Sequence, residues 1–148
     1  MRTDTAPSRL RSLPSWLLNQ AALPAQRLVS EALRALGAQR SHVSLLAAVD
    51  EFGPASQADL GRRCAIDRSD MVALINDLSG QGLVRREPDP EDRRRNVITI
   101  TDEGRDRLGA LGAVLADVQD ALLDPLSADE RRQLVRLLTR IVDHHAAD

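Results

Sequence analysis

The residues with the clearest binding chemistry stand together in segment 89–104, DPEDRRRNVITITDEG. Three adjacent arginines, residues 93–95, follow an acidic turn that contains proline, and an alternating run of β-branched residues, 97–101, comes after them. Arginine carries a permanent charge and a planar fork of donors that matches phosphate and carboxylate groups. The alternation and the turn residues predict a β-hairpin with the arginines at its tip. A basic tip of this kind suits contact with a nucleic acid.

The carboxylate next to these arginines has its own predicted role. Asp92 lies two residues before Arg94, so we expect it to orient the Arg94 guanidinium. Side chains alternate along a strand, so at most two of the three arginines, Arg93, Arg94 and Arg95, point the same way. An arginine at a hairpin tip can enter an A·T-rich minor groove, where the negative potential is strongest. The alternative is a solvated charged turn, which is what most charge runs form.

Two short capped helices are predicted before this hairpin. Ser56 to Asp59 forms a capping box with Asp in place of Glu, and Asp67 caps a further helix whose third residue is Asp70. Two short helices joined by a tight turn are typical of a helix-turn-helix, whose second helix enters the major groove. The inward face of that second helix carries the apolar residues Met71, Leu74, Ile75 and Leu78.

The opposite face of the second helix is the predicted base-reading surface. Asn can pair with adenine, Ser can serve either base edge, and Ala or Val can contact a thymine methyl. Few charges lie on this face, so it supplies specificity and leaves affinity to the hairpin. An exposed helix surface without a partner is the alternative. The candidate DNA-contacting residues of the two helices are Ser56, Gln57, Arg68, Ser69, Val72, Ala73 and Asn76.

Longer helices are predicted before this unit. We expect residues 1–11 to form a loose tail and Ser12 to cap the first helix. Pro24 should kink or break that helix near its middle, and Gly37 should end it. Ser41 is the predicted cap of the next helix, which stops before a Gly-Pro pair.

Two helices are predicted after the hairpin, and both carry apolar stripes. Thr101 caps the first, and Ser127 with Glu130 forms a capping box for the second. Steps of three and four residues along the first stripe are typical of a coiled-coil seam, which favours a subunit interface. Packing against the last helix within one chain is the alternative. The predicted interface residues are Leu108, Leu111, Leu115, Val118, Leu122, Leu134, Leu138 and Ile141.

Composition restricts the classes of function. The chain has 148 residues and a net charge of −2, so it is no generally basic nucleic-acid coat, and any such binding rests on a local patch. One cysteine excludes an intrachain disulfide, and Cys64 falls on an inward helix face, where we expect an inert thiol. We find no apolar run near the ~18 residues of a membrane span, and we expect a cytoplasmic protein.

Metal and enzyme chemistry find little support in the pattern. No His-x-x-x-His pair exists, and the adjacent His144 and His145 point in different directions on a helix, so no metal is expected. The sequence has no glycine-rich phosphate loop and no plausible pair of nucleophile and base. We therefore expect neither an enzyme nor a cofactor.

Segment 41–104 resembles the winged helix-turn-helix of the MarR family of bacterial transcriptional regulators. The family's wing pattern, Asp-x-Arg followed by a strand and Thr-x-x-Gly, is matched by Asp92, Arg94, Thr101 and Gly104. The resemblance implies a mainly α fold with a small β-hairpin wing. It divides the chain into a DNA-binding domain, 38–104, and N- and C-terminal dimerisation helices, 9–37 and 105–147.

The resemblance also implies a function. Family members are homodimers that bind a palindromic operator, usually as repressors that a small, often phenolic, ligand releases. Trp16 and Gln20, on the first helix, and His42, at the start of the second, are the candidate ligand-binding residues. The alternative is a winged helix that binds protein and not DNA. An Asp-oriented arginine tip favours DNA, and steep salt dependence of duplex binding would decide between the two.

Overall fold

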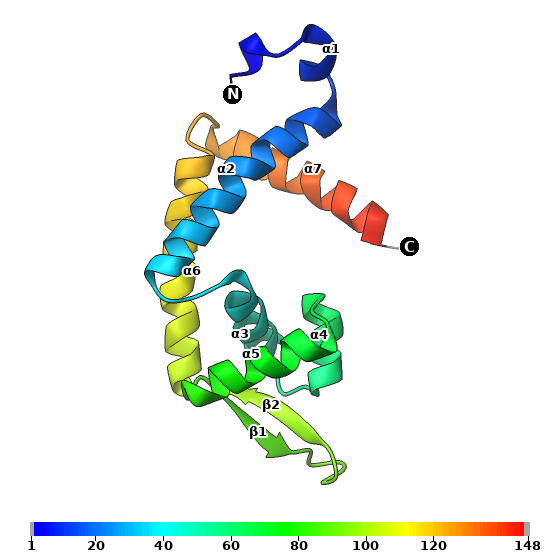
Figure 1. Ribbon diagram of the computed structural model, residues 1–148, viewed down its shortest axis with the longest axis vertical. Helices are drawn as coiled ribbons and strands as arrows, with labels where there is room; N and C mark the ends of the chain where they lie inside the picture. The colour runs from blue at the N-terminus through cyan, green and yellow to red at the C-terminus, as the bar shows by residue number, and fades with distance from the viewer. Residues whose placement is uncertain (1, 147–148) are drawn as a thin grey trace.

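The computed structural model describes residues 2–146, which form an elongated molecule with two parts (Figure 1). One part is the helix-turn-helix with its hairpin: α3 (Arg40–Phe52), α4 (Gln57–Cys64), α5 (Arg68–Gly80), β1 (Val84–Pro88) and β2 (Asn96–Ile100). The other part consists of the terminal helices: η1 (Thr3–Thr5), α1 (Ser8–Arg11), α2 (Pro14–Ala35), α6 (Asp102–Leu122) and α7 (Ala128–Ala146). This is the predicted mainly α fold with a β-hairpin. No helix within residues 2–146 has the length and apolar character needed to cross a membrane.

The two helices of the helix-turn-helix begin where the local sequence predicts. The Ser56 hydroxyl accepts a hydrogen bond from the Asp59 amide at 3.2 Å, and the Asp67 carboxylate accepts one from the Asp70 amide at 2.9 Å. Each cap satisfies an amide that the helix itself leaves without a partner. Between the helices, Ala65 adopts a left-handed conformation with φ of 53°. This tight turn joins the end of α4 to the beginning of α5.

The hairpin forms an antiparallel pair in which Val84 lies opposite Ile100 and Arg86 lies opposite Ile98. Val84 and Ile98 are buried, so the face of β1 that carries Val84 and Arg86 is turned toward the body of the domain. Ala55, just before α4, adds a single bridge to Ile98. The wing is thereby tied to the helix-turn-helix at its base, and its tip projects beyond the domain (Figure 1).

One aliphatic core joins the two parts of the molecule. It is built almost entirely from Leu, Val, Ile and Met, as the near absence of aromatic residues requires. Burial of such side chains stabilises the fold by roughly 1.5–3 kcal/mol each. Its fully buried members are Leu33, Leu45, Leu46, Val49, Leu60, Met71, Ile75, Leu78, Val84, Ile98 and Leu111.

The N-terminal region differs from the prediction in three ways. Part of the expected loose tail is helical, as η1 and α1. The cap of α2 is Leu13, without a side-chain hydrogen bond, and not Ser12. Pro24 does not interrupt α2, which continues to Ala35. A proline removes one hydrogen bond of the helix, and α2 remains continuous without it.

The start of α3 also differs. The N-cap is Gln39, and Ser41 lies inside the helix. The Gln39 side chain accepts from the His42 amide, and the Gln39 amide donates to Nδ1 of His42 at 3.1 Å. A reciprocal pair of this kind satisfies two free amides. Gln and His are unusual capping residues, so composition alone favoured the serine.

The chain itself buries two residues of the predicted seam of α6, while Leu108, Leu115 and Leu122 are only partly buried. Leu111 is 0% exposed and belongs to the core, and Val118 is buried too. The elements that pack most extensively against α6 are α2 and α3. By contrast, no residue of α7 is buried. Residue 147, the last of the predicted C-terminal segment, lies outside the described residues.

Candidate nucleic-acid interface

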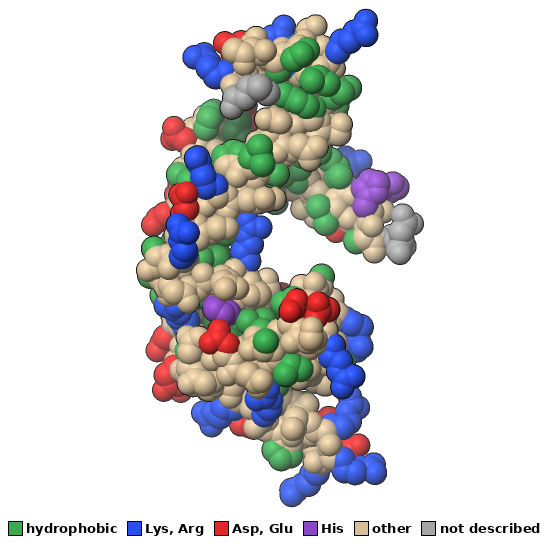
Figure 2. All heavy atoms as spheres, viewed as in Figure 1, with side chains coloured by type: hydrophobic (Ala, Val, Ile, Leu, Met, Phe, Trp, Pro, Cys, Tyr) green, Lys and Arg blue, Asp and Glu red, His purple; other side chains and the backbone are tan. Residues whose placement is uncertain are grey.

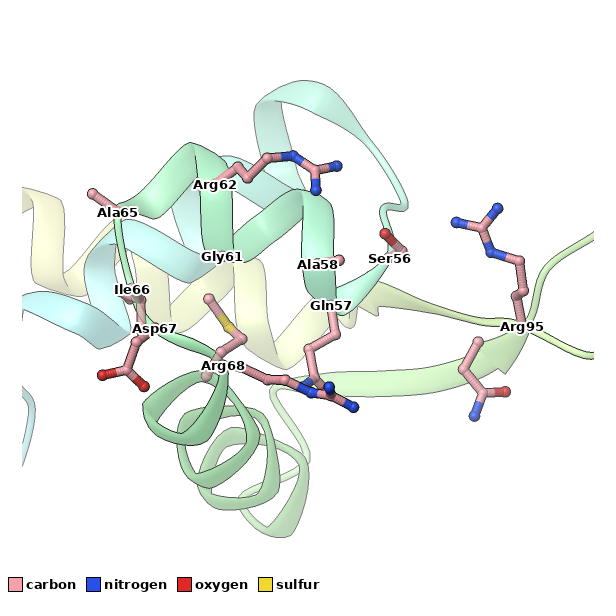
Figure 3. Close-up of a pocket in the computed structure, with 12 residues that line it drawn as sticks. Ser56, Gln57, Ala58, Gly61, Arg62, Ala65, Ile66, Asp67, Arg68 and Arg95 are labelled. Carbon is pink, nitrogen blue, oxygen red and sulfur yellow. The ribbon is translucent and has the colours of Figure 1, made fainter. Parts of the chain in front are cut away.

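A groove of about 840 Å³ lies where α4, α5 and the wing meet (Figure 3). The first residues of both helices face it, so their free amides and positive dipole ends favour an anionic partner. Ser56 and Gln57 come from the start of α4, Arg68 comes from the start of α5, and Arg95 extends from the wing. The structure therefore brings together residues that the sequence placed in three separate motifs.

The wing tip holds its carboxylate and arginine as predicted. Oδ1 of Asp92 accepts from the backbone amide of Arg94 at 3.1 Å and from Nε of Arg94 at 3.2 Å. These bonds, that of the backbone amide first, hold the pKa of Asp92 below its ordinary value. The Arg94 side chain is 91% exposed, so its remaining guanidinium donors are free to meet a partner. Asp92 restrains the direction of a side chain that would otherwise rotate freely.

The three arginines of the wing tip lie in different surroundings. Arg95 faces the groove and lies across from Ser56 (Figure 3). The carboxylate of Asp59 has a pKa below its ordinary value, chiefly because the Ser56 hydroxyl donates to it, with smaller contributions from the charges of Arg62 and Arg95. Arg93 is exposed, and no salt bridge involves it among residues 2–146. The tip thus offers charge both into the groove and beyond it.

The outward face of α5 carries Ser69, Ala73 and Asn76, all exposed, with Val72 at its flank. Two of these polar side chains already have partners. The Ser69 hydroxyl donates to Oδ1 of Asp67 at 2.9 Å. Nη2 of Arg86 donates to Oδ1 of Asn76 at 2.5 Å. Arg86 lies in β1 two residues after buried Val84, so its side chain is on the side of the strand that faces α5.

A second cleft, of about 770 Å³, lies on the other flank of α5 beside the start of α3. His42 is buried there, and its Nε2 lies 3.0 Å from Oδ2 of Asp77. Nδ1 accepts from the Gln39 amide, so Nε2 carries the proton that Asp77 accepts. Sequence reasoning selected His42 but missed Asp77, since nothing in the local pattern joins residues that far apart.

The other two candidate ligand residues do not line this cleft. Trp16 and Gln20 lie on α2, far from the end of that helix that joins the core. The rise of a helix places them about 25 Å and 20 Å along the axis from Leu33, the residue of α2 that belongs to the core. Within one chain, the predicted ligand set of Trp16, Gln20 and His42 is therefore not assembled.

The remaining candidates for chemistry have simple surroundings. The Cys64 thiol donates to the Ser44 carbonyl at 3.6 Å, and burial raises its pKa. A raised pKa disfavours the reactive thiolate. His144 and His145 meet edge to face with ring centroids 4.9 Å apart. Within residues 2–146, no three of the His, Cys, Asp and Glu side chains are grouped to hold a metal ion.

Capped helices, a left-handed turn and a paired hairpin define a winged helix-turn-helix protein. Residues 36–95 match the model of the MarR family. The chain is 30% identical to the PcaV transcriptional regulator of Streptomyces coelicolor, solved with its natural ligand, and covers all of it with a TM-score of 0.69; 97% of this chain is matched. The chain belongs to the MarR family.

Two further relatives are similar over most of the fold. The HTH-type transcriptional repressor NicR of Pseudomonas putida is 31% identical over 98 residues, which span 66% of this chain and 62% of NicR. The match thus spans less than two thirds of this curated relative. The transcriptional repressor CouR, solved on a 23-mer DNA duplex, is 26% identical with a TM-score of 0.81 over 91% of this chain and 96% of CouR.

Proposed function

We propose that the protein is a sequence-specific DNA-binding transcriptional regulator that acts as a homodimeric repressor of a palindromic operator. The observation that carries the proposal is the groove between α4, α5 and the wing, with Arg68 and Arg95 at its edges. Its shape suits one strand of the DNA backbone, with α5 in the major groove and the wing tip in the neighbouring minor groove. The relative CouR, which is solved bound to a 23-mer DNA duplex, supports DNA as the partner.

Electrostatics fit this proposal although the whole chain is acidic. Arginine side chains gather at the end of the molecule formed by α4 and the wing (Figure 2). This local patch supplies the attraction to phosphates that a net charge of −2 does not. The face of α5 carries uncharged side chains that distinguish bases, so affinity and specificity arise from different elements.

The proposed dimer uses the terminal helices and not the two buried residues of α6, Leu111 and Val118. In the single chain, large apolar side chains are exposed to solvent at the start of α2 and along α7 (Figure 2). A second copy would bury these faces and set two recognition helices about one helical turn of DNA apart. The predicted interface residues that stay in this proposal are Leu108, Leu115 and Leu122 on α6 and Leu134, Leu138 and Ile141 on α7. The exposed apolar residues added to it are Leu10, Leu13, Leu17, Leu18, Leu23, Val135, Leu137 and Val142.

We also propose that a small ligand, of the aromatic class, releases the repressor from DNA. The cleft that contains His42 and Asp77 borders α5, so a molecule there would act directly on the recognition helix. The complex of PcaV with its natural ligand supports ligand control in a relative at 30% identity. Trp16 and Gln20 would take part only if the partner subunit brings its α2 to this cleft.

An enzymatic role and a protein-binding role are both disfavoured. The relatives are transcriptional regulators, and we propose no catalytic activity and, because DNA is the target, a cytoplasmic location. A winged helix that binds only protein has no need of an arginine held at the tip by a carboxylate. Duplex binding that fails at low salt would favour this alternative.

The test is Arg94→Ala measured on a selected operator. We expect binding to weaken by about 1–3 kcal/mol per subunit without loss of folding, because the side chain is almost fully exposed. If Arg94 enters the minor groove, the loss should be larger on A·T-rich flanks than on G·C-rich flanks. If it contacts only phosphate, the loss is uniform and the salt slope falls by about one unit per subunit. Unchanged affinity would count against the wing as a DNA contact.

A further inference from the structure

The hydrogen bond between the wing and the recognition helix assigns a role to Arg86. It joins Nη2 of Arg86, on β1, to Oδ1 of Asn76, on α5, at 2.5 Å. Both side chains extend from backbone that regular secondary structure holds in place. Arg86 is flanked across the sheet by buried Ile98, and Asn76 follows fully buried Ile75. The contact therefore connects two elements whose relative position the core already sets.

The chemistry of the pair determines which end of the Asn76 amide faces outward. A guanidinium only donates hydrogen bonds, and the amide of Asn accepts only through its oxygen. The oxygen must therefore turn toward the wing, and the amino group turns away from it. Arg86 forms no salt bridge among the described residues, so no carboxylate competes for its donors. Without Arg86, the two orientations of the amide would be close in energy.

We propose that Arg86 is a positioning residue for base recognition: it holds Asn76 so that the side chain presents its amino group, a donor, to the DNA. This rests on the proposed function of the protein. Adenine is read by an amide that accepts from N6 and donates to N7, which requires the oxygen. Guanine presents the acceptors O6 and N7, and thymine presents the acceptor O4. Neither base presents an amino group in the major groove. The preferred base at Asn76 is therefore guanine or thymine and not adenine, which replaces the pairing expected from residue type alone.

The test compares five variants with the wild type on a set of duplexes in which each half-site position carries each of the four bases. Asn76→Ala should abolish the preference at one position, where a mismatch costs wild type roughly 5- to 150-fold in affinity. Arg86→Ala should abolish it at the same position. The double variant should lose no more discrimination than Asn76→Ala does. Arg85→Ala is the matched control, because it removes the same charge from the opposite face of β1 and should leave the preference intact.

Each outcome decides the matter. A wild-type preference for adenine at the Asn76 position, or an Arg86→Ala variant that keeps the wild-type preference, would overturn the proposal. Loss of discrimination at a different base pair would mean that Arg86 reads a base itself, which also overturns it. Arg86→Lys keeps the charge and a donor, and its retained preference would exclude a mere loss of folding. A wild type that shows no preference at any position would instead refute the proposed function.

Discussion

Gly104 is the position where one methyl group should have the largest effect. It lies in the first turn of α6, and its amide donates to the Thr101 hydroxyl at 3.0 Å. The same hydroxyl donates to the Gly82 carbonyl at 2.7 Å, which ties α6 to the segment before β1. A Cβ at residue 104 would lie 2.1 Å from the Leu83 carbonyl oxygen and 2.7 Å from a side-chain carbon of Ile100. Only glycine fits this approach.

Two opposing effects set the magnitude for Gly104→Ala. Alanine favours a helix over glycine by up to about 1 kcal/mol. Against this, overpacking costs about 1–3 kcal/mol. Displacing the Leu83 carbonyl also weakens its bond from the Thr101 amide, now 3.1 Å, and a buried polar group left unsatisfied costs about 1–3 kcal/mol. Overpacking and the weakened hydrogen bond together outweigh the gain in helix propensity, and we expect a net loss of about 1–5 kcal/mol in the free energy of unfolding.

Urea unfolding at one fixed protein concentration measures this, because association of subunits adds to apparent stability. Gly109→Ala is the matched control, since it lies in the same helix and a Cβ there meets nothing within 4 Å. That variant should gain about 0.5–1 kcal/mol from helix propensity alone. The two substitutions are thus expected to have opposite signs. If Gly104→Ala proves as stable as Gly109→Ala, the reasoning from close approach is refuted.

Three further substitutions test the wing, the interface and the thiol. Asp92→Ala should weaken operator binding although it removes a negative charge, because Arg94 loses its orienting partner; Glu91→Ala removes a similar charge without that loss, and tighter binding by Asp92→Ala would contradict the role assigned to the carboxylate. Ile141→Glu, at a side chain 46% exposed in one chain, should yield a folded monomer in sedimentation, and an intact dimer would exclude α7 from the interface. Cys64→Ser should be slightly less stable than the wild type, and peroxide should leave the DNA binding of both proteins unchanged. If peroxide releases the wild type from DNA but not the variant, the thiol does more than pack.

Features decided by neighbours in the chain were predicted well. Ser56, Asp67 and Thr101 cap helices through hydrogen bonds to amides three residues away, and Asp92 meets Arg94 two residues away. Such contacts form within one turn of backbone, so residue type and spacing contain the information needed. Gly104 belongs to the same motif as Thr101. The reason for a glycine there became visible only once Leu83 was placed beside it.

The role of an apolar stripe depends on distant packing. Spacing showed that Leu111 lies on an apolar stripe of α6, but the same stripe serves a subunit seam or an intrachain core equally well. For Leu111 the position of α2 decides between them, because α2 packs against α6 and its Leu33 shares the core with Leu111. α2 continues through Pro24 although its buried residue, Leu33, lies after the proline.

The sequence by itself determined the starts of α4, α5 and α6, the hairpin and its basic tip, and the apolar faces, because each follows from periodicity or from a hydrogen bond between near neighbours. Only the tertiary structure decided which of those faces the chain covers itself. It alone also brought Arg86 to Asn76 and His42 to Asp77. These contacts join residues 10 and 35 positions apart, and their geometry depends on the angle at which the wing and α3 pack against α5. Packing of the shared core sets that angle, and no local pattern in the chain specifies it.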